Sequence, residues 1–320
     1  MPHILVAGKL HPSGIALLEE AEGITYELIE EISEKSYAPL IHKADGLIIR
    51  TQPLSAKTIA NASNLKIVSR HGVGFDAVDI NSLNARNIPL AIIGDINSRS
   101  VAEHTFTLLL AASHLLMRYD QACRGKRPWN YRNSLEAQEI YGKSLLVCGF
   151  GRIGKQMASM GLNFGLKISI FDPYTQVESL PKNITLEKDL LVAIKKADFI
   201  SFHLPAADKP ILGANEIALL KPNCVILNTS RGGIIDDKAL AQALRENRIL
   251  GAGIDVFEEE PLNPNNVYSN LDNVILTPHS AGMAYESAER MAVASVQNIL
   301  NFFNEKLDYS LVVNKNDIRL

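Results

Sequence analysis

Two successive series of short apolar runs, each alternating with amphipathic stretches of helical length, constrain the fold of this chain most strongly. Such alternation predicts parallel strands joined by helices that cover both faces of a sheet. The chain has 320 residues, which is more than one hydrophobic core usually organises. We therefore expect an α/β protein of two doubly wound parallel-sheet domains with a cleft between them.

The first series occupies residues 1–97. Its apolar runs predict the strands Ile4–Ala7, Gly46–Ile49, Lys66–Ser69 and Leu90–Ile93. Its amphipathic stretches predict helices around Gly14–Glu20, Ser55–Asn61 and Asp79–Arg86. A long helix over Ser98–Tyr119 and a polar loop from Cys123 to about Ile140 then separate this series from the second.

The second series predicts the strands Ser144–Gly149, Lys167–Asp172, Phe199–His203, Val225–Thr229, Gly253–Val256 and Val274–Leu276. A last helix runs from about Tyr285 to Phe303, and we expect it to return to the first domain, since chain termini often lie close together. The predicted domains are therefore 1–97 plus 287–320 and 98–286.

Composition restricts the partners and the compartment. The net charge is −3 and 21% of the residues are charged, so nothing favours a nucleic acid or an anionic membrane as partner. The three cysteines, Cys123, Cys148 and Cys224, form no CxxC pair, which favours a reducing, cytoplasmic location. The N-terminus lacks a signal-like leader, and the apolar stretch Thr105–Met117 is too short to span a membrane.

The strongest motif is a G-x-G-x-x-G turn, Gly149 to Gly154, between a predicted strand and a predicted helix. Gly149 permits the tight turn, Gly151 lets a pyrophosphate approach the backbone, and Gly154 lets the helix pack on the strand. The free N–H groups of the helix then face the phosphates. A tight turn without a ligand is the alternative interpretation, but the strand and helix around it favour a Rossmann-like dinucleotide site in domain 98–286.

Asp172 ends the next predicted strand and indicates which dinucleotide binds. A carboxylate there accepts hydrogen bonds from the adenosine ribose hydroxyls and repels a 2′-phosphate. The following residues, Pro173-Tyr174-Thr175, include no arginine to hold such a phosphate. We therefore expect NAD rather than NADP.

Three more segments carry reactive side chains at the ends of predicted strands, where open α/β sheets bind ligands. Arg231 follows Val225–Thr229, Asp255 lies at the end of an apolar run before the acidic Glu258–Glu260, and His279 follows Val274–Leu276. An arginine can hold a carboxylate through two parallel hydrogen bonds, and a histidine is a general acid/base near neutral pH. Around a dinucleotide, these groups suit hydride transfer at a 2-oxo acid. Solvated surface side chains are the alternative for Arg231 and the acidic run.

With these motifs, the chain resembles the D-isomer-specific 2-hydroxyacid dehydrogenase family along nearly its whole length. The resemblance rests on Gly149–Gly154, Asn228–Gly233, Gly251–Pro261 and Thr277–Gly282 in order, together with Ser69–Asp76 and Ser100–His104. It implies an NAD-dependent enzyme acting on CH–OH donors.

The family's site residues carry over to matching positions. The resemblance implies that Arg231 binds substrate, that His279 is the acid/base, and that Glu260 pairs with His279 and raises its pKa. Asp255 matches the residue that holds the nicotinamide carboxamide, and Val73 and Gly74 match a loop that holds the substrate carboxylate. Further cofactor contacts are implied for Arg152, Ile153, Asp172, Leu204, Thr229 and Ser230.

The resemblance leans toward the phosphoglycerate dehydrogenase and hydroxypyruvate reductase branch, which implies a role in serine biosynthesis. Arg50 and Arg70 match positions that face the substrate's phosphate, and Arg132 is a possible third charge; solvated surface arginine is the equal alternative for all three. The chain departs from the family in two places. The segment His203–Pro210 lacks the family's threonine, and the chain ends soon after its last helix, without a serine-sensitive regulatory domain.

The Ser98–Tyr119 helix and its loop resemble the family's dimerisation arm. Apolar residues nearly encircle this helix, so its own domain or a partner must bury them. We expect a two-fold homodimer.

Three alternatives remain. Within the same family, the substrate is hydroxypyruvate, glyoxylate or another 2-oxo acid. A non-catalytic NAD-sensing corepressor shares the fold and can retain residues such as Arg231, Glu260 and His279. The chain lacks the disordered tails and basic segments expected of such a protein. A metal-dependent enzyme is disfavoured because the eight histidines are scattered and no HExxH pair occurs.

Overall fold

The computed structural model describes residues 1–125, 129 and 132–319, and the chain divides into two compact units. The first unit comprises Met1–Asn97 and Met283–Leu320, and the second comprises Ser98–Gly282. The second division falls at Gly282 rather than at the predicted 286. Met283 already belongs to the first unit, where its Sδ lies 3.6 Å from Nη2 of Arg50.

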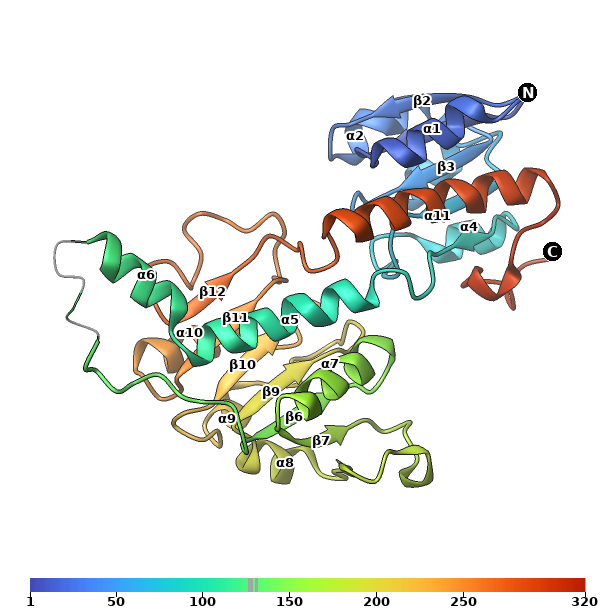
Figure 1. Cartoon of the computed structure of the whole chain (residues 1–320). Coiled ribbons are helices and arrows are strands. Elements are labelled where there is room, and N and C mark those ends of the chain that lie inside the picture. Colours follow the sequence, from blue (N-terminus) through green and yellow to red (C-terminus); the bar gives the residue numbers. More distant parts are fainter. Residues whose placement is uncertain (126–128, 130–131, 320) are drawn as a thin grey trace. The chain divides into compact units, whose positions relative to one another are not determined.

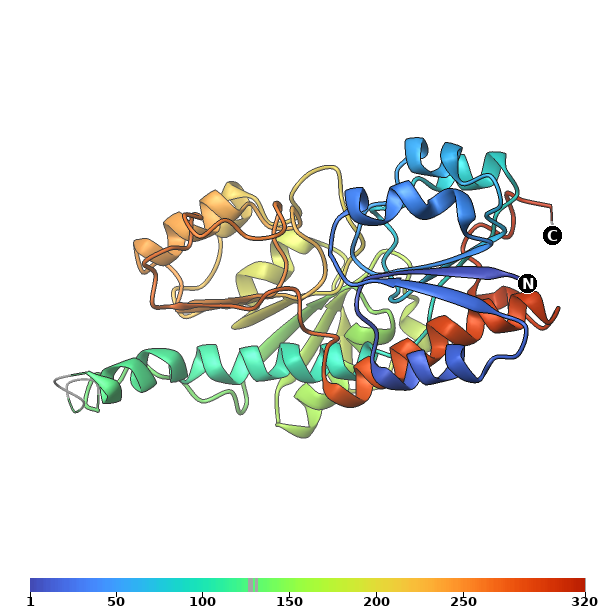
Figure 2. The same ribbon diagram turned by 90° about the horizontal axis from the view of Figure 1, so that it is seen from above.

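The first unit is a five-stranded sheet with helices on both faces (Figures 1 and 2). The strands pair in parallel in the order β2-β1-β3-β4-β5. They are β1 (His3–Ala7), β2 (Thr25–Ile29), β3 (Gly46–Ile49), β4 (Ile67–Arg70) and β5 (Leu90–Ala91).

The helices of this unit form two layers. α1 (Pro12–Glu20) and α11 (Tyr285–Phe303) pack together over one face, burying a cluster that includes Ile4, Val6, Ala292 and Val296. The opposite face is covered by α2 (Glu34–Tyr37), η1 (Ala38–Lys43), α3 (Ala56–Asn61) and α4 (Ile80–Ala85). The last helix of the chain therefore packs with the first.

The second unit has a seven-stranded parallel sheet in the order β12-β11-β10-β9-β6-β7-β8. Its strands are β6 (Ser144–Cys148), β7 (Lys167–Phe171), β8 (Ile184–Leu186), β9 (Phe199–Phe202), β10 (Val225–Asn228), β11 (Gly251–Ile254) and β12 (Val274–Leu276). Helices α5 (Ser98–Ser113) and α7 (Arg152–Asn163) cover one face, and α8 (Leu190–Lys196), α9 (Ala214–Ile217) and α10 (Asp237–Arg245) cover the other. Two sheets with helices on both faces confirm the predicted fold class.

Buried apolar strands account for this architecture. All residues of β3, β9, β10 and β11 are buried, as expected of parallel strands covered on both faces. Cys148 and Cys224 are completely buried, which confirms that they are core residues. The prediction missed β2 and β8, which form the outer edges of the two sheets and have mixed, partly exposed side chains. It also placed β11 two residues too late.

The predicted single helix Ser98–Tyr119 is wrong, since the structure has two helices there. α5 ends at Ser113, Leu115 adopts a left-handed conformation with φ 52°, and α6 runs from Leu116 to Arg124. The carbonyl of Ser113 accepts a hydrogen bond from the backbone N–H of Gln138 (3.0 Å). The segment that leads from α6 back to β6, which we call the returning segment, thus bonds to a carbonyl group that a continuous helix would use. The turn between α5 and α6 also buries Leu115, which is 4% exposed.

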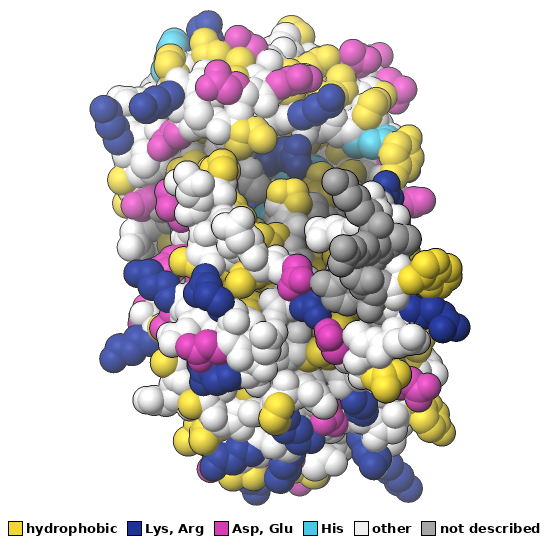
Figure 3. All heavy atoms as spheres, turned by 90° about the vertical axis from the view of Figure 1, so that its left-hand side faces the viewer, with side chains coloured by type: hydrophobic (Ala, Val, Ile, Leu, Met, Phe, Trp, Pro, Cys, Tyr) yellow, Lys and Arg dark blue, Asp and Glu magenta, His cyan; other side chains and the backbone are white. Residues whose placement is uncertain are grey.

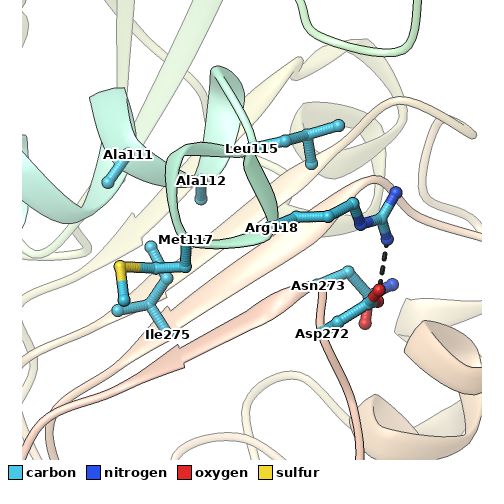
Figure 4. A pocket seen from close by; sticks show the side chains of 8 residues that line it. All are labelled: Ala111, Ala112, Leu115, Met117, Arg118, Asp272, Asn273 and Ile275. Carbon is cyan, nitrogen blue, oxygen red and sulfur yellow. Dashed lines mark hydrogen bonds and ion pairs between the residues drawn. The ribbon is translucent and has the colours of Figure 1, made fainter. Parts of the chain in front are cut away.

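Ion pairs fix the start of α6. Arg118 reaches Asp272 (2.9 Å) before β12 and Glu136 (2.6 Å) in the returning segment. Figure 4 shows Arg118 pointing to Asp272 at the rim of a small pocket between the α5–α6 turn and β12.

No described helix is both long and apolar enough to cross a bilayer. On the face shown in Figure 3, basic and acidic side chains are interspersed, in keeping with the small net charge of −3.

Candidate active site

The glycine turn after β6 has the space that a dinucleotide needs. Gly149 has φ 91°, and a Cβ there would lie 2.4 Å from the carbonyl oxygen of His203. A Cβ on Gly154 would lie 2.0 Å from the carbonyl oxygen of Gly149, whereas a Cβ on Gly151 would meet nothing within 4 Å. Two glycines therefore close the turn, while the third leaves open space at the start of α7, where an anion is favoured.

Asp172 lies beside this turn, as the sequence predicted for a ribose ligand. Its Oδ2 accepts a hydrogen bond from the backbone N–H of Phe150 (2.7 Å), and its Oδ1 accepts one from that of Tyr174 (2.8 Å). These bonds orient the carboxylate next to the open space at Gly151. The residues present therefore fit NAD, with Arg152 exposed and Ile153 half-buried on the first turn of α7.

The sheet order places this turn at a topological switch point. β6 lies between β9 and β7, so chain connections leave it in opposite directions, and such crevices bind ligands. A Cβ on Gly149 would also lie 3.0 Å from Leu204 Cδ2, so Leu204 borders the turn.

Thr229 and Ser230, predicted as cofactor contacts, are buried at the end of β10. Thr229 Oγ1 lies 2.7 Å from Thr105 Oγ1. The hydroxyl of Ser230 donates to Asn228 Oδ1 (2.8 Å). Both side chains thus have internal partners that shape the loop.

Asp255 is completely buried and holds the turn that carries His279. Its Oδ1 accepts hydrogen bonds from the hydroxyl of Thr277 (2.6 Å) and the backbone N–H of Ser280 (2.9 Å), and its Oδ2 accepts one from Ala281 N–H (3.0 Å). His279 itself has φ 51°, and its N–H donates to the carbonyl of Asp255 (2.8 Å). A buried acid therefore holds His279 in a left-handed conformation, which few non-glycine residues adopt.

His279 pairs with Glu260. Nδ1 of His279 lies 2.7 Å from Oε2 of Glu260, and Oε1 of Glu260 accepts a hydrogen bond from the N–H of Phe257 (3.0 Å). Partial burial acts to raise the pKa of Glu260, but its hydrogen bonds and the charges of His279 and Arg231 outweigh burial and lower it. The carboxylate is thus held ionised beside the imidazole, whose Nε2 remains for a substrate.

Arg231 lies in a loop that packs against the Glu260 segment. Asn228 Nδ2 donates to the carbonyl of Arg231 (2.9 Å), and Arg231 Nη1 donates to that of Ser230 (2.7 Å). A Cβ on Gly232 would lie 1.9 Å from the carbonyl oxygen of Phe257, so only glycine lets these loops meet. The second unit therefore brings Arg231, Glu260 and His279 together beyond the carboxyl ends of three neighbouring strands, β10, β11 and β12.

One neighbour of this group was given no role by the sequence. His104 Nε2 on α5 lies 3.1 Å from the hydroxyl of Thr277 and 3.7 Å from Asp255 Oδ1. The motif Ser100–His104 marked the segment, but only the fold shows that it supports the His279 turn. Among the described residues, no cluster of three or more His, Cys, Asp or Glu is placed to hold a metal.

The remaining predicted residues lie elsewhere. In the first unit, Arg50 follows β3 and Arg70 is the last residue of β4. Val73 and Gly74 form a half-buried loop just beyond β4. Nη1 of Arg50 donates to the carbonyl of Lys9 (2.7 Å), and Nη1 of Arg70 donates to that of His71 (3.0 Å). Arg132 is exposed in the second unit, 5.9 Å from the centre of the Trp129 ring.

A dinucleotide turn, an aspartate beside it and a histidine paired with a glutamate near an arginine are features of nicotinamide-dependent oxidoreductases. Comparison with known proteins specifies the class. The profile of the family described as D-isomer specific 2-hydroxyacid dehydrogenase, NAD binding domain, matches residues 106–281.

Two curated relatives differ in length. A D-3-phosphoglycerate dehydrogenase of Methanocaldococcus jannaschii is 38% identical over 91% of this chain, but the match covers only 55% of that protein. A glyoxylate reductase of Aeropyrum pernix is 32% identical over 97% of this chain and 96% of its own length. The chain thus spans about half of the former protein and nearly all of the latter.

A solved D-lactate dehydrogenase of Aquifex aeolicus, complexed with NAD and lactic acid, has a TM-score of 0.85. It is 25% identical, and the match covers 95% of this chain and 96% of that one. Solved structures with this fold hold either NAD or NADPH. The chain belongs to the D-isomer-specific 2-hydroxyacid dehydrogenase family, which confirms the resemblance seen in its motifs, and residues 106–281 match the family's NAD-binding domain.

Proposed function

We propose that this protein is an NAD-dependent oxidoreductase that interconverts a D-2-hydroxy acid and its 2-oxo acid. The observation that carries the proposal is the 2.7 Å pair between His279 and Glu260, with the charge of Arg231 acting on the same carboxylate. A bound nicotinamide supplies or accepts the hydride.

The side chains then have complementary roles. Arg231 holds the substrate carboxylate by charge-assisted hydrogen bonds and polarises the carbonyl group. Protonated His279 donates from Nε2 to the forming alkoxide during reduction and accepts that proton during oxidation. Glu260 fixes the imidazole through Nδ1 and stabilises its charged form. The main role of Asp255 in this proposal is to hold the turn that carries His279.

The cofactor assignments follow the same logic. Gly151, Arg152 and Ile153 offer backbone groups to the pyrophosphate, Asp172 binds the ribose, and Leu204 borders the turn. Thr229, Ser230 and Asp255 lie at the ends of neighbouring strands. Support for this set comes from the open space at Gly151 and the oriented carboxylate of Asp172.

For the substrate we favour 3-phosphoglycerate and its 2-oxo acid, phosphohydroxypyruvate, which would place the protein in serine biosynthesis. The 38% identity to a phosphoglycerate dehydrogenase supports this choice. Arg50 gives further support, because burial lowers the pKa of its guanidinium and it forms no ion pair among the described residues. A half-buried cation without an acidic partner suits an anionic ligand. Arg70, Val73 and Gly74 complete the proposed substrate side.

A glyoxylate or hydroxypyruvate reductase is the second candidate. The observation in its favour is that the match to a named glyoxylate reductase covers 96% of that protein.

NADH oxidation with a panel of 2-oxo acids separates these candidates. The panel is phosphohydroxypyruvate, hydroxypyruvate, glyoxylate, pyruvate and sulfopyruvate. We expect the highest kcat/KM with phosphohydroxypyruvate; a preference for glyoxylate or hydroxypyruvate would select the second candidate. Tight NADH binding without turnover of any acid would contradict the enzyme and favour a sensor of the corepressor type.

We further propose a cytoplasmic homodimer. The three cysteines of the chain form no disulfide with one another, which supports a reducing compartment such as the cytoplasm. Support for the dimer comes from large exposed apolar side chains concentrated between residues 116 and 141, namely Leu116 (55% exposed), Trp129 (75%), Leu135 (92%) and Tyr141 (78%). Such exposed apolar surface is typical of an interface.

A further inference from the structure

Unsatisfied polar atoms concentrate at one edge of the first unit. Eight buried side-chain nitrogen and oxygen atoms have no hydrogen-bond partner among the described residues. Four of the eight belong to three residues: Nε of Arg50, Nε2 and Oε1 of Gln52, and Nε2 of His71. Native proteins leave few such atoms, because each costs free energy. Their concentration in one place therefore indicates a built polar site.

Distances place these groups together. A Cβ on Gly8, which has φ 101°, would lie 2.8 Å from Gln52 Nε2 and 2.9 Å from Arg50 Cδ. The backbone N–H of His71 donates to the carbonyl of Ile49 (2.8 Å), directly before Arg50. The charges of Arg50 and Arg70 both act on His71. Only a glycine at position 8 leaves room for Gln52 and Arg50 above the end of β1.

The topology of the sheet gives this cluster a place where ligands bind. β1 lies between β2 and β3, so the crevice between the carboxyl ends of β1 and β3 is the switch point of this sheet. Gly8 follows β1, and Arg50 and Gln52 follow β3. Gln52 lies in a loop, where a change of rotamer can turn its carboxamide toward a bound group.

The chemistry of the cluster selects a particular kind of group. Gln52 is 2% exposed and His71 is 6% exposed. Burial and the two arginines lower the pKa of His71 to about 3, so its imidazole is neutral at working pH. A neutral carboxamide both donates and accepts, as a hydroxyl group does, whereas a guanidinium only donates. The cluster thus pairs one cation with two neutral groups that suit an uncharged oxygen.

We propose that Gln52 is a specificity-determining residue whose carboxamide hydrogen-bonds the oxygen on C3 of a 2-oxo acid, with Arg50 and His71 completing the subsite. This inference rests on the proposed function and deepens it. The oxygen belongs either to a free hydroxyl group, as in hydroxypyruvate, or to a phosphate ester. Pyruvate, with a methyl group at C3, would leave both amide atoms unsatisfied, which sites built for a hydroxyl group discriminate against strongly.

Substrate ratios test this role. kcat/KM is measured with hydroxypyruvate, phosphohydroxypyruvate and pyruvate. The proteins compared are the unaltered protein, Gln52→Leu and, as control, Thr51→Ala at the exposed neighbouring position. In Gln52→Leu we expect the preference for each oxygenated acid over pyruvate to fall about tenfold or more, with kcat/KM for pyruvate and KM for NADH unchanged. The oxygenated acid that the unaltered protein prefers identifies the source of the oxygen.

Three outcomes would overturn the role of Gln52: unchanged ratios, an equal loss with all three acids, or a fall confined to the phosphorylated acid. Calorimetric Kd values for D-glycerate and D-lactate in the presence of NADH provide a readout without turnover, because the reduced cofactor cannot oxidise either acid. If no acid is turned over but D-glycerate binds more tightly than D-lactate, and Gln52→Leu removes the difference, the proposed activity fails while the subsite stands. If neither variant nor unaltered protein distinguishes the two acids, the subsite fails.

Discussion

The carboxylate of Glu260 shows how single residues set the chemistry of this site. Partial burial would raise its pKa, yet the hydrogen bond with His279 and the nearby positive charges lower it. The same contact holds the imidazole of His279 in one orientation, with Nδ1 toward the carboxylate. The residue types were evident from the sequence, but their 2.7 Å approach depends on the fold.

A substitution at Glu260 tests this coupling. Reduction requires protonated His279, so its rate falls as pH rises through the loss of that proton. Glu260→Gln removes the negative charge beside the imidazole, and we expect it to move the falling limb of kcat/KM for 2-oxo acid reduction to lower pH. Glu259→Gln, at an exposed position in the same loop, should leave the limb in place. An unmoved limb in Glu260→Gln would show that the pair does not control the proton.

At the scale of elements, strand ends and glycine turns position the reactive groups. The buried strands and the last helix, Tyr285–Phe303, were predictable because apolar runs and helical periodicity report burial directly. Edge strands β2 and β8 were not, because their exposed positions carry polar residues. The break at Leu115 was not predictable either, since it depends on Gln138 bonding to the carbonyl of Ser113.

Two glycines of the dinucleotide turn provide a matched pair of variants. A Cβ on Gly151 meets nothing, so Gly151→Ala should fold with unchanged thermal stability but raise KM for NADH about tenfold or more, a loss of about 1.4 kcal/mol. A Cβ on Gly154 meets backbone at 2.0 Å, so Gly154→Ala should lower the free energy of unfolding by about 1–3 kcal/mol. Thermal unfolding and NADH titration measure both effects. Unchanged NADH binding in Gly151→Ala would show that the open space is not the cofactor site.

At the scale of the whole molecule, the family membership and the two α/β units follow from ordered motifs whose spacing the sequence displays. Which substrate the protein takes does not follow from them. Sequence reasoning identified Arg50 and Arg70, but not Gln52 or His71, because a buried polar side chain without a partner becomes visible only in three dimensions.

Assembly is tested at the same scale. If the exposed apolar side chains between residues 116 and 141 form a dimer interface, sedimentation should give twice the mass of the 35.1 kDa chain. Leu116→Glu should shift the population toward monomer, because it places charge in a desolvated contact. Ile32→Glu, at another exposed apolar position (70%), is the control. A monomer at micromolar concentration in the unaltered protein would contradict the dimer.

The most direct test of the proposed activity is NAD reduction with the D and L forms of glycerate, 3-phosphoglycerate and lactate, measured for the unaltered protein and for His279→Gln. The account predicts turnover of D forms alone and a loss of kcat of at least about 100-fold in His279→Gln, with NAD binding retained. Turnover of the L forms, or full activity without His279, would contradict it.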